Sequence, residues 1–236
     1  MIKLLNKVIM SIMLLISIIS IDAKSQSLEE YIDKSNGNTY NTVQIGRQIW
    51  MTENLDVDRF RNGDIIPQAK NNYDWNVANN KKLPICRYYD DDSFQNKVYG
   101  KLYNWYAVND PRGLAPKGWR IPKDEDWLIL NRSFDGESGI HLRSPGGWLE
   151  GFKYGAGRII NDNSSGFSAL PSGEFGFTFG GSFTGIGEYA IWWCINSHPA
   201  QPLVSAYTCT LRNDYSGISI AGSGKNHGLS VRCIKD

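Results

Sequence analysis

Four cysteines and three histidines are the residues whose types could support covalent or metal chemistry. Cys86, Cys194, Cys209 and Cys233 are widely spaced, and the chain has none of the close CxxC or HxxxH pairs that zinc sites favour. In an oxidising compartment an even number of cysteines indicates disulfides, and four cysteines allow three pairings. We therefore expect two disulfides, with metal ligation as the weaker alternative.

The other side chains give little support to catalysis. His141, His198 and His227 lie far apart among turn-forming residues, and we expect each of them in a surface loop. Serines are numerous, but no GxSxG nucleophile elbow is present. We therefore expect a protein that is not an enzyme and that binds neither a metal ion nor a cofactor.

The first residues have the pattern of a secretory signal peptide. Two lysines precede an apolar run from Val8 to Ile21, and small residues follow at Ala23 and Ser25. The run has about 14 residues, whereas a membrane-spanning helix needs roughly 20. We expect residues 1–23 to be removed, with Ser25 as the competing cleavage position, and the mature chain to be secreted, periplasmic or on the cell surface without a membrane span.

The net charge of the chain limits the classes of binding partner. The full chain has 25 Lys and Arg against 24 Asp and Glu, and removal of residues 1–23 takes away two lysines and one aspartate. The mature chain is therefore balanced in charge. A balanced surface argues against nucleic acid or an anionic membrane as the main partner.

The elements that would position a site begin after a polar arm. Residues 24–38 lack periodicity, so we expect a flexible arm followed by one domain over residues 39–236. Apolar and polar residues then alternate over residues 42–51 on both sides of Gly46-Arg47, which predicts two strands joined by a type II′ turn. Residues 61–82 are rich in Asn, Asp and Gly and indicate a surface loop.

Two later segments have helical signals. Leu102, Trp105 and Tyr106 are spaced to share one face of a short helix. A proline followed by three acidic residues within 122–126 is typical of a helix start, because acidic side chains complement the positive end of the helix dipole. We expect Trp127 on the buried face of that second helix.

The second half is rich in glycine and phenylalanine and ends in segments with strand patterns. The last of them alternates Leu229, Val231 and Cys233 with Ser230 and Arg232, which predicts one buried and one polar face. A few short helices followed by a turn-rich antiparallel sheet indicate an α+β domain. The expected strands cover residues 189–196, 205–213, 216–222 and 227–235.

Several segments together resemble a known family. The sequences TVQIGRQIWMTENLD, YGKLYNWYAVND, APKGWRIPKDEDWLIL, SGFSALPSG and GLSVRCIKD occur in the order that is typical of the Fibrobacter succinogenes major paralogous domain. The resemblance extends from Asn38 to Asp236 and implies an exported or cell-surface bacterial domain. It also implies a C-type lectin-like fold, with few short helices, a twisted antiparallel sheet and long Gly-rich loops, and a distant similarity to the formylglycine-generating sulfatase-modifying domain.

The resemblance also bears on the cysteines. The family often has cysteine where Ala115 stands and serine where Cys194 stands. Lectin-like domains commonly have a nested disulfide near the C-terminal strands, which implies Cys194 with Cys209 and leaves Cys86 with Cys233. The missing family cysteine at Ala115 leaves the partner of Cys233 open.

Calcium-dependent sugar binding is common in lectin-like domains, but its signatures are absent. The chain has no EPN or QPD motif and no WND motif. The aspartates Asp90–Asp92 and the segment Asn161–Asn163 contain oxygen ligands of the kind that calcium takes. Solvated turns explain both segments with fewer assumptions.

Ligands of lectin-like domains usually meet the irregular loops of the second half. By this fold analogy, which does not establish a function, the candidate ligand-binding residues are Trp148, Tyr189, Asn196 and Asp214. Trp75, in its Asn-rich loop, and Trp148 are the tryptophans that we expect to be exposed. Trp119, Trp127 and Trp192 lie in apolar periodic segments and are expected in the core.

Three functions follow as hypotheses. The first is a non-enzymatic binding module, secreted or at the cell surface, whose ligand is a glycan or a protein. The second is a structural or assembly component of the cell envelope. The third, favoured least, is an oxidase of the sulfatase-modifying type that would use Cys194 and Cys209 as a reactive pair.

Overall fold

The structure is a computed structural model of the 236-residue chain. It describes residues 29–33, 37–153, 157–158, 160–176 and 181–236. The expected signal peptide, residues 1–23, lies outside the described residues. Among the described residues, no helix combines the length and apolar character needed to cross a membrane.

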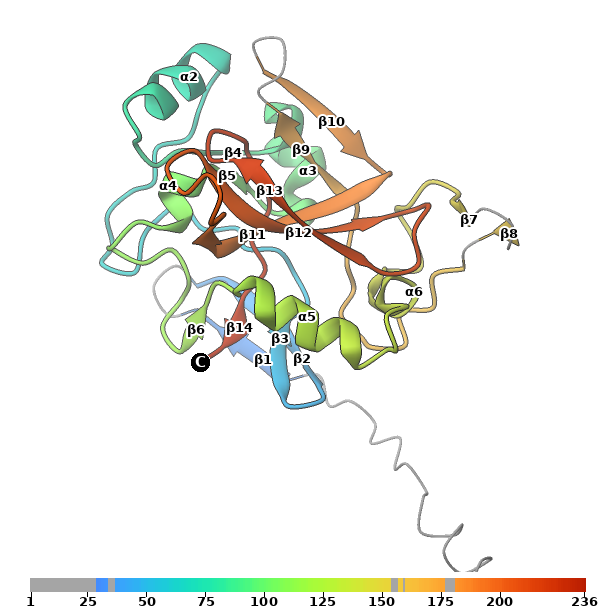
Figure 1. The fold of residues 1–236 in the computed structure, drawn as a ribbon. Helices are drawn as coiled ribbons and strands as arrows, with labels where there is room; N and C mark the ends of the chain where they lie inside the picture. The colour runs from blue at the N-terminus through green and yellow to red at the C-terminus, as the bar shows by residue number, and fades with distance from the viewer. Residues whose placement is uncertain (1–28, 34–36, 154–156, 159, 177–180) are drawn as a thin grey trace, which may run out of the picture.

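The first sheet joins the two ends of the domain (Figure 1). Its C-terminal strand pairs with the N-terminal hairpin, where Ile234 faces Trp50. The phenol ring of Tyr31 also contacts Trp119 at 5.3 Å between ring centroids, so the sheet curls and its two edge strands approach. The strand order is β1 (Glu29–Ile32), β2 (Thr39–Ile45), β3 (Gln48–Met51), β14 (Ile234–Lys235) and β6 (Trp119–Arg120).

The second sheet forms the other half of the domain. Its pairs are antiparallel, except that β11 runs parallel to β9. The strand order is β10 (Ser182–Ile186), β9 (Ser172–Gly176), β11 (Tyr189–Ser197), β12 (Ser205–Arg212) and β13 (Ile218–Gly224). Two small ladders join β4 (Cys86–Arg87) to β5 (Leu102–Tyr103) and β7 (Phe152–Lys153) to β8 (Gly157–Arg158).

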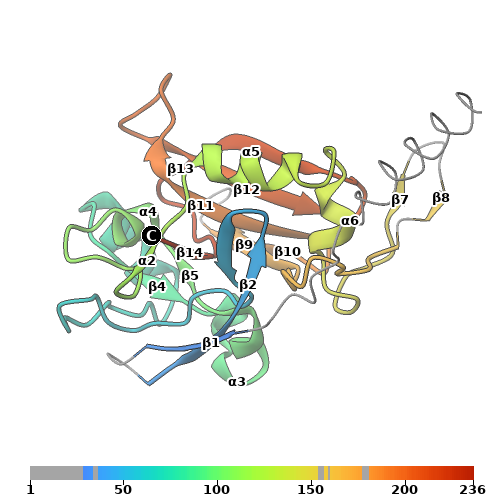
Figure 2. The same cartoon turned by 90° about the horizontal axis from the view of Figure 1, so that it is seen from below.

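The helices are short, and α5 packs on β11 and β12 (Figure 2). The described α-helices are α2 (Asn72–Asn80), α3 (Ser93–Asn96), α4 (Trp105–Val108), α5 (Asp124–Arg132) and α6 (Ser138–Leu142). Two 3₁₀ turns, η1 (Tyr89–Asp91) and η2 (Lys97–Tyr99), flank α3. This arrangement confirms an α+β domain with few short helices and antiparallel sheets, in which strands predominate over helices.

Several local predictions are confirmed. The hairpin of β2 and β3 turns at Gly46, whose φ is +59° while Arg47 has no positive φ, as a type II′ turn requires. Helix α5 begins at Asp124, directly after Pro122 and Lys123, and buries Trp127. Its third residue, Asp126, accepts a hydrogen bond from the Lys123 backbone N–H at 2.7 Å, which stabilises the helix start.

Other local predictions are wrong. Residues 29–32 of the expected flexible arm form β1, because they pair with residues 39–42 of β2. The segment 61–82 is not all loop: Asn71 caps α2 by accepting a hydrogen bond from the Asp74 N–H. Helix α2 also buries Trp75 completely, so this tryptophan is not an exposed platform.

The segment around Trp105 also differs from its prediction. Leu102 belongs to β5, and helix α4 begins only at Trp105. Leu102 and Trp105 are buried as expected, whereas Tyr106 is half-exposed. The cause is Asn104, whose side chain accepts a hydrogen bond from Ala107 N–H and starts the helix there.

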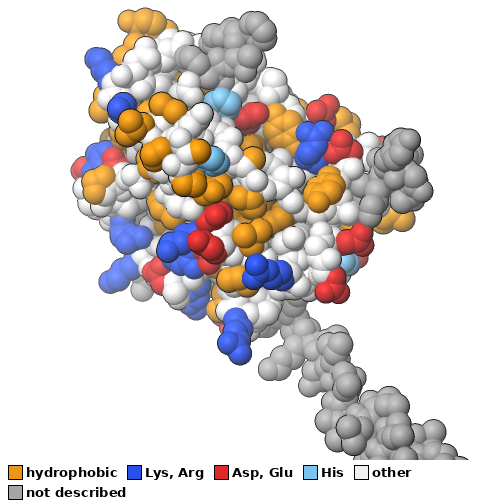
Figure 3. Space-filling view, viewed as in Figure 1, with side chains coloured by type: hydrophobic (Ala, Val, Ile, Leu, Met, Phe, Trp, Pro, Cys, Tyr) orange, Lys and Arg blue, Asp and Glu red, His pale blue; other side chains and the backbone are white. Residues whose placement is uncertain are grey.

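Tryptophans build the core between the two sheets. Trp50, Trp127 and Trp192 are fully buried and contact one another or Phe167 at ring distances of 4.7 to 6.1 Å. Trp119, Trp127 and Trp192 are thus core residues, as predicted. On the face seen in Figure 3, basic, acidic and apolar side chains are interspersed, in keeping with the balanced charge.

Candidate binding sites

The four cysteines are buried free thiols, so neither expected disulfide is present in the structure. On the second sheet Cys209 lies opposite Trp192, which places Cys194 diagonally from it. Diagonal Cβ atoms are about 7 Å apart, whereas a disulfide needs about 4 Å. The Cys86 thiol points elsewhere and donates to the Pro67 carbonyl at 3.6 Å. The disulfides were predicted from the even number of cysteines, which carries no information on where the thiols point or how far apart they lie.

Burial also makes these thiols poor nucleophiles. It raises the pKa of Cys86 and of Cys233 to about 12. Burial likewise raises the pKa of Cys194 and of Cys209. Because the thiolate is the reactive form, none of the four is poised for attack at neutral pH. The burial and raised pKa values of Cys194 and Cys209 argue against a reactive pair formed by these two residues.

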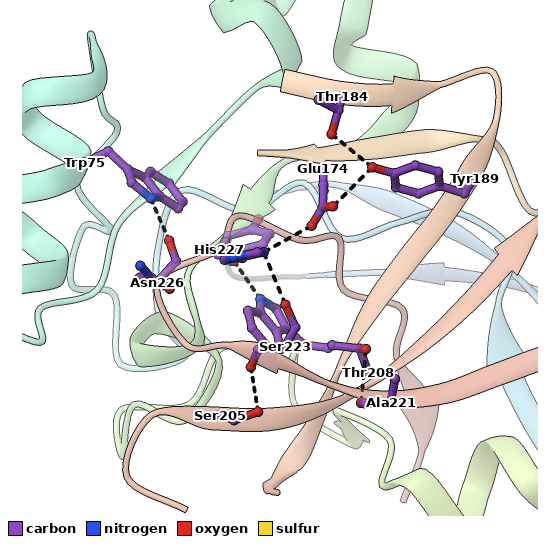
Figure 4. A network of polar contacts seen from close by, with 12 residues as sticks. Trp75, Glu174, Thr184, Tyr189, Ser205, Thr208, Ala221, Ser223, Asn226 and His227 are labelled. Atoms are coloured by element: carbon purple, nitrogen blue, oxygen red, sulfur yellow. Dashed lines mark hydrogen bonds and ion pairs between the residues drawn. The ribbon is translucent and has the colours of Figure 1, made fainter. Parts of the chain in front are cut away.

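His227 lies in a polar network between the strands of the second sheet (Figure 4). Its Nδ1 is 3.2 Å from Glu174 Oε2 and also 3.2 Å from Ser223 Oγ. A Ser-His-acid triad needs the serine and the acid at opposite ring nitrogens, because the imidazole passes a proton between them. Both contacts here use the same nitrogen, so the three residues are not arranged as a triad.

Tyr189, one of the expected ligand-binding residues, belongs to the same network. Its hydroxyl donates to Glu174 Oε1 at 3.1 Å and lies 3.0 Å from Thr184 Oγ1 (Figure 4). Burial raises the pKa of Tyr189 to about 12, so the phenol stays protonated. The tyrosine therefore links β9, β10 and β11.

Trp148 and Asp214, two further residues of the expected set, lie on segments next to Tyr189. Tyr189 pairs with Arg212, and the Arg212 guanidinium binds Asp214 at 2.9 Å. The Arg143 guanidinium lies over the Trp148 ring at 5.5 Å and donates to the Arg212 carbonyl. Three of the four expected residues are thus linked through Arg143 and Arg212 at one corner of the second sheet.

Asn196 is separate from that corner. It lies near the other end of β11, where its side chain donates to Asp124 Oδ1 at 2.6 Å. Trp148 is also engaged, because its indole N–H donates to the Ala169 carbonyl at 3.0 Å. None of the four expected residues lines the cavities described below.

No candidate metal site stands out in the described part of the chain. There, no three His, Cys, Asp or Glu side chains gather as a metal site would require. Within the segments considered for calcium, Asp91 binds Arg87 and Asp162 binds His141 at 3.2 Å. These acidic residues have protein partners.

A cleft of about 450 Å³ lies beside β1 and was not foreseen from the sequence. Its walls come from three segments that are far apart in the chain. The phenol of Tyr31 donates to the Lys117 carbonyl at 3.2 Å and joins two of these walls. We call this cavity the β1 cleft; it is lined by Tyr31, Ile32, Asp33, Val57, Arg59, Arg61, Leu114, Ala115, Pro116 and Lys117.

The rim of the β1 cleft is basic. Arg59, Arg61 and Lys117 lie on it, against the single acid Asp33, which is buried. Arg61 donates to the carbonyls of Ala115, Pro116 and Trp119, and no carboxylate of the described residues is within ion-pair distance of it. Among the described residues, the cleft therefore offers apolar walls and more basic than acidic side chains.

The backbone of β1 borders the cleft. β1 is an edge strand of its sheet. The Asp33 N–H donates to the Asn38 carbonyl at 2.8 Å, which makes these two residues a hydrogen-bonded pair. Since such pairs alternate along an antiparallel ladder, the backbone groups of Glu30 and Ile32 point away from β2. Among the described residues, no strand pairs with this outer edge, which leaves it open to a further strand.

A second cavity of about 330 Å³ adjoins the β1 cleft, since Arg61, Leu114 and Ala115 line both. The Arg61 side chain separates the two by its bonds to Ala115. Sequence periodicity gives no sign of either cavity, because the lining residues come from segments that are far apart in the chain.

Comparisons with known proteins identify a family to which the sequence is similar. The model of the Fibrobacter succinogenes major domain matches residues 43–235, most of the chain. No curated protein matches the chain, and no solved structure does.

Proposed function

We propose that this chain, which belongs to the Fibrobacter succinogenes major domain family, is a secreted or cell-surface binding module without enzymatic activity. Its ligand is an extended, acidic segment of another protein that lies in the β1 cleft. The observation that carries the proposal is a strand edge that no described strand pairs with, beside an apolar cleft with a basic rim.

Each feature of the cleft matches a part of such a ligand. An added strand would pair its backbone with the outward N–H and C=O groups of Glu30 and Ile32. Its apolar side chains would contact Val57, Leu114 and Pro116 in the walls. Its acidic side chains would face the basic rim, which favours them over basic ones.

The lack of enzymatic activity is supported by the geometry of the reactive groups. The thiols are buried with raised pKa values, and His227 meets both Glu174 and Ser223 through one nitrogen. The oxidase hypothesis therefore has no reactive cysteine pair to rest on. Export, which the N-terminal sequence favours, remains part of the proposal.

We further propose that the domain is related to the C-type lectin-like fold. The pairing of the C-terminal strand β14 with the N-terminal hairpin, and the second antiparallel sheet above it, support this relation. An experimentally determined structure with a different strand order would overturn it.

Selection from a displayed random peptide library on the immobilised domain tests the proposed function. Enriched peptides should combine acidic and apolar residues, and they should bind the wild type in preference to a variant with Arg59→Glu and Lys117→Glu. Enrichment of basic peptides would contradict an acidic ligand, and no enrichment at all would count against a protein ligand. An envelope-assembly role, the remaining alternative, would then gain weight.

A further inference from the structure

A third cavity contains a buried arginine. This cavity of about 400 Å³ lies on the outer side of β2 and the segment that follows β3, and it shares no residue with the β1 cleft. Its lining is rich in hydroxyl and amide groups. We call it the Arg232 pocket; it is lined by Asn41, Thr52, Glu53, Asn54, Val98, Ser144, Asn163, Gly166, Ser168, Leu170 and Arg232.

Arg232 is 1% exposed and is held by neutral oxygen atoms. Its Nε and Nη2 both donate to Asn54 Oδ1, at 3.0 and 2.8 Å. Its Nη1 donates to the backbone carbonyls of Thr52 and Phe167, at 2.6 and 2.8 Å. Nη1 also lies 3.2 Å from the Met51 carbonyl oxygen. The bond to Asn54 is the one hydrogen bond that Nη2 makes within the described residues, so one of its two N–H bonds has no acceptor among them.

No described carboxylate forms an ion pair with this guanidinium. Glu53, in the wall of the same pocket, directs its two oxygens to Asn41, at 2.9 Å from the backbone nitrogen and 2.7 Å from Nδ2. Burial lowers the pKa of Arg232 to about 9, because an environment shielded from water disfavours its charge. The Glu53 carboxylate attracts the guanidinium from a distance and offsets this effect only in part. A buried cation without a carboxylate in direct contact is unfavourable, so an anion beside Arg232 would be stabilised.

We propose that the Arg232 pocket binds a hexuronate, a six-carbon sugar acid, with its carboxylate toward the guanidinium of Arg232 and its hydroxyls toward the polar walls. Arginine suits this role because its planar guanidinium recognises carboxylates. The proposal concerns a second site and does not depend on the β1 cleft.

The walls favour a sugar acid over a simpler anion. Hydroxyl and amide groups from Thr52, Ser144 and Asn163 line the pocket. Ser144 already donates to the Gly146 carbonyl and Asn163 exchanges hydrogen bonds with Ser168, so a polyhydroxylated ligand would use the second N–H of the amide and the remaining lone pairs of the hydroxyls. Val98 and Leu170 add apolar surface for the C–H faces of a sugar ring. An inorganic anion would leave both kinds of wall unused, and Glu53 would repel a dianion.

Titration calorimetry of the full mature domain with D-glucuronate, D-glucose and inorganic phosphate tests the proposal. We expect saturable binding of glucuronate, with glucose and phosphate weaker by roughly tenfold or more. Glu53→Gln should raise the ratio of glucuronate to glucose affinity, because it removes a like charge from the pocket wall. Equal binding of glucuronate and glucose, or stronger binding of phosphate, would overturn the assignment.

A substitution at the surface of the Arg232 pocket tests where glucuronate binds and leaves the buried Arg232 unchanged. Val98 is 63% exposed at the pocket, and Leu203, at 79%, is exposed on the β11–β12 loop. Val98→Trp should obstruct the pocket and lower glucuronate affinity by about tenfold, whereas the matched Leu203→Trp should leave it unchanged. Loss in both variants, or in neither, would show that glucuronate does not bind in this pocket.

Discussion

The phenolic oxygen of Tyr31 lies 3.2 Å from the backbone carbonyl oxygen of Lys117, to which it donates a hydrogen bond. This contact joins β1 to the loop before β6, 86 residues along the chain. The Tyr31 ring also contacts Trp119 at 5.3 Å, so one side chain bridges the two edges of the first sheet. The β1 cleft exists because this bridge holds its walls together.

Replacement of Tyr31 should separate the roles of its ring and its hydroxyl. Tyr31→Ala removes a wall of the cleft and should weaken binding of a selected acidic peptide by roughly tenfold or more. Tyr31→Phe keeps the ring and should change affinity by less than about threefold, since one partly exposed hydrogen bond contributes about 1 kcal/mol or less. Fluorescence anisotropy of the labelled peptide measures both, and equal affinities for Tyr31→Ala and wild type would contradict the cleft assignment.

The basic rim should control the rate and salt dependence of binding. Arg59→Glu with Lys117→Glu should slow association of acidic peptides and reduce the salt dependence of the affinity. Lys70→Glu with Lys81→Glu changes charge equally at the two ends of α2, at the far end of the domain from β1 (Figure 1), and should have little effect. Stopped-flow measurements at low and high salt make the comparison, and equal effects of the two double variants would show that only net charge matters.

Thiol counting tests the state of the cysteines. The structure predicts four free thiols in protein that is unfolded in denaturant without a reductant. In the folded protein the same reagent should react slowly, because all four side chains are buried. A count of zero after denaturation would instead establish two disulfides and would require movement of the β11–β12 pair.

The start of α5 predicts a pH-dependent stability. Burial by itself raises the pKa of Asp126, but hydrogen bonds from Arg120 and from the Lys123 N–H lower it by more. The net result is a pKa below the ordinary aspartate value of 3.8. A depressed carboxyl pKa stabilises the fold above the unfolded pKa, and this stabilisation is lost as pH falls through the folded value.

Asp126→Asn should therefore cost about 1 kcal/mol at pH 7, a value reduced by the partial exposure of Arg120. The difference from wild type should begin to shrink below about pH 4, where the carboxyl of the unfolded chain becomes protonated, and should continue to shrink as pH falls through the lower pKa of the folded state. Urea unfolding at pH 7 and at pH 3 measures it. A difference that stays constant across this range would show that the charge of Asp126 does not stabilise α5.

Local chemistry made part of the fold predictable from the sequence. The β2–β3 hairpin follows from alternation and from one glycine, and α5 follows from a proline, acidic residues and Trp127. The start of α2 had a similar signal in Asn71 and Asp74, but the surrounding asparagines have low helix propensity and masked it. What decides α2 is tertiary: Trp75 is buried, and its indole donates to the Asn226 carbonyl at 2.9 Å.

The sites were less predictable because distant segments form them. Arg232 fits the polar half of an alternating strand, yet Asn54 and backbone carbonyls that are remote in sequence surround it and make burial possible. The strand itself shortens to Ile234–Lys235. Tyr31 lay in a segment without periodicity, and only its contacts with Lys117 and Trp119 reveal a role.

Amide hydrogen exchange along β1 tests the central claim most directly. It would be followed by NMR on the domain alone and saturated with an acidic peptide selected from the library. If the peptide adds a strand to β1, the N–H groups of Glu30 and Ile32 should exchange at least about tenfold more slowly in the complex, while those of Tyr73 and Leu203 stay unchanged. Saturated binding without any slowing at Glu30 and Ile32 would contradict the account.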